Sequence, residues 1–310
     1  MFTARAETRS EVGRSPLVDV VVVAYNSRVV LRDAVNPLVG NADLNVIVVD
    51  NASRDDSLAA VRDLPIESIR LNQNGGFAHG CNHGWRAGRA PYVLFLNPDG
   101  RIESAEIKKL VDLLARDDRA GVVAPLIRRD DGTIDFSLRR FPRLRSTYAQ
   151  AVFLQRIFPR REWSDEVIRD PHAYRRRAEV DWVSGACMLV KRAVLDEVSG
   201  WDERFFLYCE DIDLCKQVHD AGFDVLFEPS AVAVHVGGSS ESRAALLPTL
   251  AESRIRYARK HRTPITRLLE RLGIGLGALT HVLVSKGGAE SRAGHARSLG
   301  VVVGRAPSRP

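Results

Sequence analysis

Val18-Asp-Val-Val-Val-Val-Ala24 is a nearly continuous β-branched run, and Tyr25-Asn26-Ser27 follows it directly. Such a run is typical of a strand buried on both faces, and Asn26 or Ser27 can cap a helix after it. The same order of apolar strand, polar turn and helical segment recurs along the chain. Strands that alternate with helices predict an α/β fold with a mainly parallel central sheet flanked by helices. In such a sheet, ligands bind beyond the carboxyl ends of the strands.

The same patterning predicts the remaining elements and the extent of the domain. Strands are expected at 45–50, 68–71, 91–96, 121–126, 181–190, 223–227 and 231–235. Helices are expected at 28–39, 55–64, 78–88, 104–116 and 210–221, with one more ending at 198. An Arg-rich stretch at 128–180 shows little periodicity and predicts an irregular insertion with one short helix near 148–158. Residues 17–240 are therefore expected to form one domain.

The two ends of the chain differ from this domain in composition. Residues 1–16 are polar and predict a flexible leader without a signal peptide. Residues 241–285 predict basic and amphipathic C-terminal helices, and residues 286–310 predict a flexible tail. The longest apolar run, 272–284, has 13 residues, and a membrane-spanning helix needs roughly 20. The sequence therefore argues against a transmembrane protein.

The amino-acid composition indicates which binding partners and which cellular compartment the protein is expected to have. The chain has 310 residues and a formal net charge of +6, a balance that suits an anionic substrate, an anionic lipid or nucleic acid. The sequence contains no recognisable nucleic-acid-binding motif, so we expect no nucleic-acid partner. The four cysteines, at 81, 187, 209 and 215, lack the CxxC spacing of zinc or redox sites. Buried, reduced thiols favour a cytoplasmic location.

Two aspartates come directly at the ends of predicted strands. Asp50 ends the strand at 45–50 and can accept hydrogen bonds from a nucleotide base or a ribose hydroxyl, although such an acid often only caps a turn. Asp99 follows the strand at 91–96 within Asn97-Pro98-Asp99-Gly100. Its carboxylate suits a Mg²⁺ or Mn²⁺ ion that neutralises a diphosphate, and the same residues also encode a simple type I turn.

A glycine pair lies between the second and third helices. Asn74-Gly75-Gly76-Phe77 allows the backbone to approach a ligand closely. A dinucleotide-binding loop would instead need G-x-G-x-x-G after the first strand, where this chain has Ala24-Tyr-Asn-Ser27. The sequence also lacks G-x-x-x-x-G-K-[ST]. Rossmann dehydrogenases and P-loop enzymes are therefore excluded.

Two further motifs carry candidate catalytic groups. Glu210-Asp211-Ile212-Asp213 places three acids at the start of a predicted helix, which is more than capping requires. We expect one of them to act as a general base. His235 ends the last predicted strand, just before Val-Gly-Gly, and is a candidate metal ligand.

Taken in order, these motifs resemble the family 2 glycosyltransferases with the GT-A fold. The resemblance is nearest to bacterial rhamnosyltransferase-like members, and it spans residues 18–240. The matching stretches are 21–26, 48–53, 74–77 with Asn82, 96–99, 184–187, 205–214 and His235.

The resemblance implies a role for each matching residue. The residues implied in nucleotide-sugar binding are Ala24, Tyr25, Asn26, Asp50, Asn51, Gly75, Gly76, Asn82, Asn97 and Asp99. The metal, Mg²⁺ or Mn²⁺, would be held by Asp99 and His235. Asp211 would be the general base that deprotonates the acceptor hydroxyl. The acceptor or sugar site would be lined by Gly185, Ala186 and Glu210.

The resemblance also implies an activity. The enzyme would be an inverting glycosyltransferase that moves a sugar, such as rhamnose, from a dTDP- or UDP-sugar to a hydroxyl of a glycan or of a lipid-linked cell-envelope acceptor. Many members carry Asp-x-Asp at the metal motif, whereas this chain has Asn97 in the first position and so offers one carboxylate.

Two other classes stay open. One is a catalytically inactive, nucleotide-sugar-binding scaffold of the same fold, against which the presence of both Asp99 and Asp211 argues. The other is a sugar nucleotidylyltransferase, which would carry a glycine-rich, Lys/Arg-bearing signature near the first strand. The sequence lacks that signature.

The composition of the C-terminal helices bears on where in the cell the protein acts. A basic helix followed by an apolar-faced segment too short to span can lie in a membrane interface and be attracted by anionic lipid. We therefore expect possible peripheral contact with the inner face of the cell membrane. The alternative is that these helices pack on the core or form a dimer contact.

Overall fold

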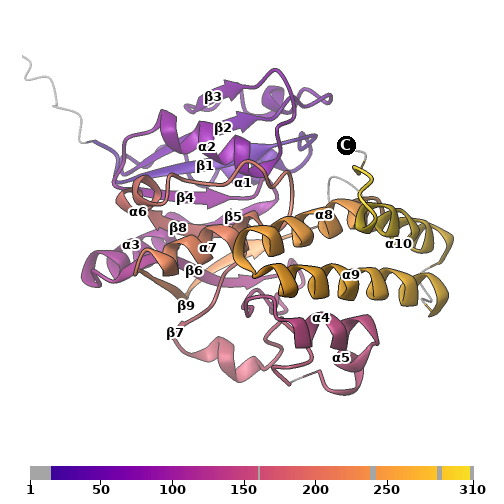
Figure 1. Ribbon diagram of the computed structural model, residues 1–310. Helices are drawn as coiled ribbons and strands as arrows, with labels where there is room; N and C mark the ends of the chain where they lie inside the picture. Colours follow the sequence, from indigo (N-terminus) through magenta and orange to yellow (C-terminus); the bar gives the residue numbers. More distant parts are fainter. Residues whose placement is uncertain (1–14, 160, 238–241, 285–287, 308–310) are drawn as a thin grey trace, which may run out of the picture.

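The computed structural model describes residues 15–159, 161–237, 242–284 and 288–307. These residues form a nine-stranded sheet with the order β3-β2-β1-β4-β8-β6-β9-β5, and β7 pairs with β9 beside this path (Figure 1). The strands are β1 (Val18–Ala24), β2 (Leu44–Asp50), β3 (Glu67–Arg70), β4 (Tyr92–Leu96), β5 (Gly100–Ile102), β6 (Ala120–Arg128), β7 (Ala178–Glu179), β8 (Cys187–Lys191) and β9 (Asp224–His235). The predicted α/β class is confirmed.

The sheet is mixed rather than mainly parallel. β1, β2, β3 and β4 pair in parallel, as the strand–helix alternation predicted. β8 then enters between β4 and β6 and runs antiparallel to both. It follows the long insertion, which returns the chain to the sheet from the opposite end. The segments expected as strands at 223–227 and 231–235 are one strand, β9, whose pairing with β6 shifts register in the middle.

Helices cover both faces of the sheet. They are α1 (Leu31–Val35), α2 (Phe77–Ala87), α3 (Ser104–Arg116), α4 (Leu144–Ala151), α5 (Leu154–Ile157), α6 (Arg192–Glu197), α7 (Glu210–Asp220), α8 (Arg243–His261), α9 (Pro264–Val284) and α10 (Gly288–Val302), with 3-10 helices η1 (Ser57–Ala60) and η2 (Pro171–Arg175). The helix expected at 28–39 is confined to α1, because Pro37 has no N–H to extend the hydrogen-bond ladder. The segment at 55–64 contains only η1, which follows Asp56 with a left-handed φ of 51°.

Strand β1 shows how the sequence builds two cores. Alternate residues of a strand point to opposite faces of the sheet. Val20 and Val22 belong to the core that includes α1 and α3, whereas Val21 and Val23 belong to the core that includes α2 and α7. The continuous apolar run is therefore explained by burial on both faces. All four cysteines are buried free thiols.

The C-terminal region is helical over more of its length than predicted. The tail expected to be flexible at 286–310 contains α10, which packs on α8 and α9. A Cβ atom on Gly294 would lie 2.3 Å from the Ala244 carbonyl oxygen, so this glycine allows α10 to approach α8 closely. The expected leader at 1–16 falls mostly outside the described residues, as do 285–287 and 308–310.

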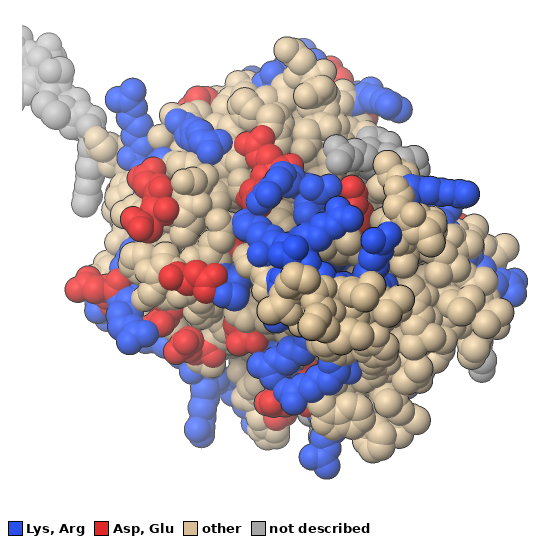
Figure 2. All heavy atoms as spheres, viewed as in Figure 1, with Lys and Arg blue, Asp and Glu red and all other residues tan. Residues whose placement is uncertain are grey.

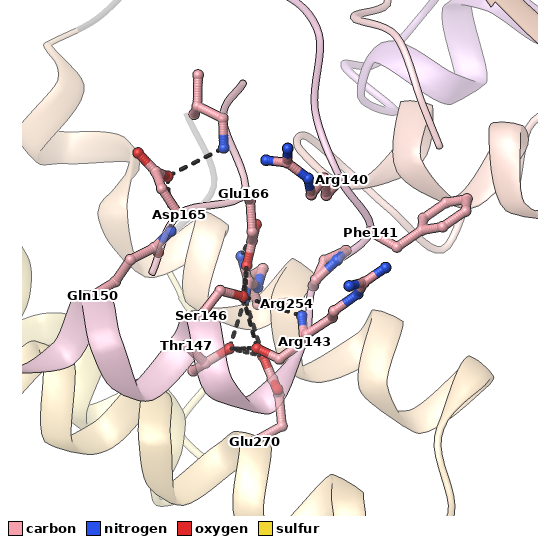
Figure 3. Close-up of polar contacts among 12 residues, drawn as sticks. Arg140, Phe141, Arg143, Ser146, Thr147, Gln150, Asp165, Glu166, Arg254 and Glu270 are labelled. Atoms are coloured by element: carbon pink, nitrogen blue, oxygen red, sulfur yellow. Dashed lines mark hydrogen bonds and ion pairs between the residues drawn. The ribbon is translucent and has the colours of Figure 1, made fainter. Parts of the chain in front are cut away.

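A buried ion-pair network ties these helices to the insertion (Figure 3). Arg254 on α8 donates to both carboxylate oxygens of Glu166, each at 2.8 Å, and to Glu270 on α9 at 3.0 Å. Thr147 on α4 donates to Glu270 at 2.7 Å. The Arg254, Glu166 and Glu270 side chains are only 15%, 9% and 5% exposed. One guanidinium therefore joins α8, α9 and the insertion.

Arg254→Met should destabilise the protein strongly. The substitution leaves Glu166 and Glu270 buried without their cation, and breaking a buried ion pair in this way costs about 3–5 kcal/mol. Urea unfolding followed by circular dichroism measures the free energy of unfolding. The matched control is Arg256→Met on the same helix, which removes a more exposed pair with Glu252 and should cost less than about 1 kcal/mol. Equal losses in the two variants would contradict this role for the network.

Candidate active site

The first part of the site lies where β1 and β2 end side by side. Asp50 is opposite Ala24 in the parallel register, and the Asn51 amide donates to the Ala24 carbonyl at 2.8 Å. Asp50 is buried, and its Oδ1 accepts a hydrogen bond from the Ser53 amide at 3.1 Å. The Arg70 Nε lies 3.6 Å from its other oxygen. The carboxylate is thus held in place at the carboxyl edge, as predicted.

The turns after these two strands are joined to each other. Asn26 has a left-handed φ of 50°, its amide donates to Ser53 Oγ at 3.0 Å, and its side-chain oxygen accepts from the Arg54 amide at 2.9 Å. The Tyr25 amide donates to Ser27 Oγ at 3.2 Å, and the Tyr25 residue is half-buried. Ser53 therefore links the turn after β1 to Asp50, because its hydroxyl accepts from Asn26 and its amide donates to Asp50.

The glycine loop crosses over to the segment before α7. Gly76 has a φ of +92°, and a Cβ atom there would lie 2.1 Å from the Phe206 carbonyl oxygen. This oxygen accepts a hydrogen bond from the Phe77 amide at 2.9 Å. Only glycine combines this backbone angle with this approach. Asn51 holds the loop, because its side chain donates to the Gly76 carbonyl at 3.0 Å and accepts from the Gly75 amide at 3.1 Å.

Asn82 has a structural role rather than the predicted ligand-binding one. Its side chain is buried and donates to the Trp201 carbonyl at 2.8 Å and to Glu203 at 2.7 Å. Its oxygen accepts from Trp85 Nε1 and from the Trp201 amide. Each polar atom of the amide is used within the protein, so Asn82 has none left for a ribose or a diphosphate.

The second part of the site is the corner between Asp99 and His235. Gly100 of β5 pairs with His235 of β9, and the Val236 amide donates to the Asp99 carbonyl at 3.1 Å. These contacts place His235 Nε2 3.2 Å from Asp99 Oδ1. Asn97 also reaches the corner, with Nδ2 3.3 Å from His235 Nε2. The structure therefore brings Asn97, Asp99 and His235 together at one corner.

The donor atoms at this corner fit a divalent cation. A carboxylate oxygen and an imidazole nitrogen are typical protein ligands of Mn²⁺, and hard cations complete their shell with water and phosphate oxygens. Across the described ranges, no group of three or more His, Cys, Asp or Glu side chains could hold a metal ion. The protein groups at this corner that could hold a cation are one carboxylate and one imidazole, in agreement with the single carboxylate at the motif.

Asp135 is a site residue that the sequence patterning missed. It lies in the insertion, and its Oδ2 is 3.9 Å from His235 Nδ1. The interaction with the His235 ring lowers the pKa of Asp135. Burial alone would lower the pKa of His235, but the interactions with the Asp135 and Asp99 carboxylates outweigh it and raise the pKa to about 9. No local motif marks Asp135, because only the folding of the insertion brings it to the corner.

The third part of the site is the start of α7. Asp211 is half-buried, and its Oδ2 accepts from the Gly185 amide at 3.2 Å, while Oδ1 accepts from the Ile212 amide at 2.9 Å. Ala186, the residue after Gly185, accepts a hydrogen bond from the Asn97 amide at 2.9 Å. The Gly185–Ala186 dipeptide therefore connects Asp211 to the Asn97–Asp99 segment through its first amide and its last carbonyl. Burial raises the pKa of Asp211.

The neighbouring acids on α7 have different surroundings. Asp213 is fully buried and pairs with Lys260 at 2.8 Å and His261 at 2.6 Å, both at the end of α8. Its carboxylate is used to anchor the helix. Glu210 is 5% exposed, and its Oε2 has no hydrogen-bond partner among the described residues. Burial, with the charge of Asp211 next, raises the pKa of Glu210 to about 8.

The backbone before α7 is strained. Tyr208 and Cys209 both have left-handed φ angles, 70° and 65°, which cost energy in non-glycine residues. Ser253 on α8 donates to the Leu207 carbonyl at 2.8 Å and helps to hold this segment. Such strain persists only where surrounding contacts determine the conformation, and here it sets the first turn of the helix that carries Asp211.

Sequence comparisons show which known proteins this chain is similar to. The model of glycosyl transferase family 2 matches residues 19–198. The N-acetylglucosaminyl-diphospho-decaprenol L-rhamnosyltransferase of Mycobacterium tuberculosis is 33% identical over 213 residues, which cover 64% of this chain and 69% of that protein. Rhamnosyltransferase WbbL of Escherichia coli is 29% identical, over 52% of this chain and 60% of that one.

Solved structures share the architecture at low identity. The mannosyltransferase PcManGT from Pyrobaculum calidifontis, in complex with GDP-Man and Mn²⁺, has a TM-score of 0.55 at 18% identity, covering 94% of this chain and 81% of that one. Residues 1–349 of S. aureus TarS with UDP-GlcNAc have a TM-score of 0.58 at 15% identity, covering 92% and 80%. These likenesses concern the fold, which is GT-A. Since the family model matches more than half of the residues, the chain belongs to glycosyl transferase family 2 and is a glycosyltransferase.

Proposed function

We infer that the enzyme transfers a sugar, rhamnose by preference, from a nucleoside-diphosphate donor to an acceptor hydroxyl with inversion at the anomeric carbon. The observation that carries this is the Gly185–Ala186 peptide, which joins the half-buried Asp211 to the Asn97–Asp99 motif. This dipeptide would have the proposed base, Asp211, at one end and the proposed diphosphate site, near Asp99, at the other. Such an arrangement suits a single displacement of the diphosphate by the acceptor hydroxyl. The names of the similar rhamnosyltransferases support the choice of sugar.

Asp211 would act as the general base. Its carboxylate takes the proton from the acceptor hydroxyl as that oxygen forms a bond to the anomeric carbon, and the bond from this carbon to the diphosphate oxygen breaks at the same time. One displacement inverts the configuration and needs one base, so no second carboxylate is required. The burial that raises the pKa of Asp211 makes it a stronger base near neutral pH.

Asp99 and His235 would hold a Mg²⁺ or Mn²⁺ ion, as their donor atoms allow. When bound, such an ion neutralises the charge of the diphosphate leaving group. The donor's base and ribose would lie between Asp50 and the turn at Tyr25 and Asn26, with Gly75 and Gly76 close to the diphosphate. The proposed donor is a dTDP-sugar or a UDP-sugar.

The acceptor is proposed to be a glycan or a lipid-linked cell-envelope precursor. The relative from Mycobacterium tuberculosis is named for a diphospho-decaprenol substrate, which supports a lipid-linked hydroxyl acceptor here. Gly185, Ala186 and Glu210 would border the acceptor or the sugar. A buried Glu210 whose carboxyl stays protonated can donate a hydrogen bond to a sugar hydroxyl, which an ionised carboxylate cannot do.

Asp211→Asn should reduce turnover by about 10²–10⁴-fold, because the amide keeps the size of the side chain but cannot accept a proton. Donor binding should stay close to that of the wild type. Release of the nucleoside diphosphate during transfer measures turnover, and calorimetry measures binding. High activity in Asp211→Asn together with inactivity in Glu210→Gln would identify Glu210 as the base. Inactivity of the wild type with every donor and acceptor would favour the inactive scaffold.

Asp99→Ala should abolish divalent-dependent binding of the nucleoside diphosphate, and His235→Ala should weaken it, because each removes a ligand of the cation. Thermal-shift measurements with Mn²⁺ and UDP, dTDP, GDP or CDP report this binding and also select the nucleotide. If Asp99→Ala responds to Mn²⁺ and the preferred nucleotide as the wild type does, the cation site lies elsewhere.

Glu210→Gln should stabilise the free enzyme more at pH 8 than at pH 5. In the folded chain the carboxyl keeps its proton up to about pH 8, whereas its ordinary pKa is 4.5. As the pH rises between these values, the unfolded chain loses the proton first, so the native state loses stability. The variant has no carboxyl to titrate and so avoids this loss. Its free energy of unfolding at pH 8 should exceed that of the wild type by about 1 kcal/mol or more.

Thermal unfolding of both proteins at the two pH values measures this difference. The matched control is Asp220→Asn, which changes an exposed acid on the same helix. An identical pH trend in Glu210→Gln and Asp220→Asn would contradict burial of Glu210 as the cause.

A further inference from the structure

Helix α9 turns an apolar stripe to the outside of the molecule. Seven Leu and Ile residues fall within a stripe about 100° wide when the helix is drawn at 3.6 residues per turn. They are Ile265, Leu268, Leu269, Leu272, Leu276, Leu279 and Leu283. All of them except the half-buried Leu276 are between 38% and 76% exposed. At a rise of 1.5 Å per residue the stripe is about 27 Å long.

The opposite side of α9 is already covered. A Cβ atom on Gly273 would lie 2.9 Å from the Thr147 side chain, and one on Gly277 would lie 3.5 Å from Ala151, so α9 packs closely on α4. Gly275 faces Val302 at the end of α10. The apolar stripe is thus not the inner face of the helix, and a contiguous exposed apolar surface of this kind marks an interaction site.

The charge around the stripe is strongly positive. Residues 242–310 contain 13 of the 45 Lys and Arg but only three of the 39 Asp and Glu. Of these three acids, Glu270 is buried in the network with Arg254, and Glu252 pairs with Arg256. Figure 2 shows blue Lys and Arg side chains above and below one end of a tan area that lies over α9. An apolar stripe bordered by cations complements an anionic phospholipid surface.

The stripe begins next to the catalytic helix. Lys260 and His261, which hold Asp213 on α7, come just before the first residues of α9 (Figure 1). A flat surface that contacts the stripe therefore lies close to the helix that carries Asp211. None of the helices within the described ranges is long and apolar enough to cross a membrane. The stripe can instead lie along an interface.

We propose that the outward face of α9 is a docking surface for an anionic phospholipid bilayer, with the helix lying in the plane of the membrane interface. The leucines enter the boundary between headgroups and acyl chains, and the neighbouring arginines contact lipid phosphates. This proposal rests on the proposed function in one respect, since a lipid-linked acceptor presents its hydroxyl close to such a surface. Binding to lipid itself does not require catalysis.

Vesicle flotation of the full-length protein, without donor or acceptor, tests the docking. The wild type should float with vesicles of phosphatidylglycerol mixed with phosphatidylcholine, and less with phosphatidylcholine alone. The triple variant Leu268→Gln, Leu272→Gln, Leu279→Gln keeps the charge and should bind at least about tenfold more weakly, because it removes apolar area from the contact. The matched control is Val29→Gln, which changes an apolar residue that is 91% exposed on the loop before α1.

Several results would overturn the proposal. One is that the wild type does not float with the anionic vesicles. The others are that the triple variant floats as well as the wild type, or that Val29→Gln loses as much vesicle binding as the triple variant. A wild-type dimer that the triple variant converts to a monomer, measured by light scattering, would show that a second copy covers α9. Thermal unfolding checks that the triple variant is folded. Because flotation needs no turnover, an inactive enzyme that floats would reject the proposed function and leave the docking surface intact.

Discussion

The antiparallel pairing of β8 with β4 is the constraint on which the active site depends. Its register places Cys187 opposite Leu96, so that the next residues along, Ala186 and Asn97, meet through a main-chain hydrogen bond of 2.9 Å. On one side of this contact is the corner of Asp99 and His235, and on the other is Asp211, held by the Gly185 amide. A shift in the register would separate Asp211 from the corner of Asp99 and His235.

The C-terminal helices support the same arrangement from outside the family match, which ends at residue 198. Lys260 and His261 contact the buried Asp213 carboxylate, and Arg254 joins α8 to the insertion and to α9. These contacts hold the first turn of α7 against the strain of its left-handed entry. They also leave α9 with its covered side facing the enzyme and its apolar side facing outward. Helix α8 thus holds α7 in place, and helix α9 carries the proposed lipid-binding face.

The three acids of α7 show how surroundings assign roles to similar side chains. Asp213 is held by Lys260 and His261 at the end of α8, so its carboxylate is used within the protein. Glu210 has one oxygen with no hydrogen-bond partner in the described part of the chain and a pKa raised to about 8, so it suits hydrogen-bond donation. Asp211 is half-buried and accepts two backbone hydrogen bonds, which orient its carboxylate. This combination of partial exposure and fixed orientation is why Asp211, rather than Glu210 or Asp213, is proposed as the general base.

The sequence by itself determined the α/β class, the strand-end positions of Asp50 and Asp99 and the acidic start of α7, because strand periodicity and turn chemistry are local. It did not reveal the mixed sheet or the closeness of Asp135 to His235, since both arise from how the insertion returns to the sheet. It also led to a ligand-binding role for Asn82, whose amide is used by Trp201 and Glu203 more than 100 residues away. The tertiary structure alone decided these points, because contacts between distant segments leave no periodic signal in the chain.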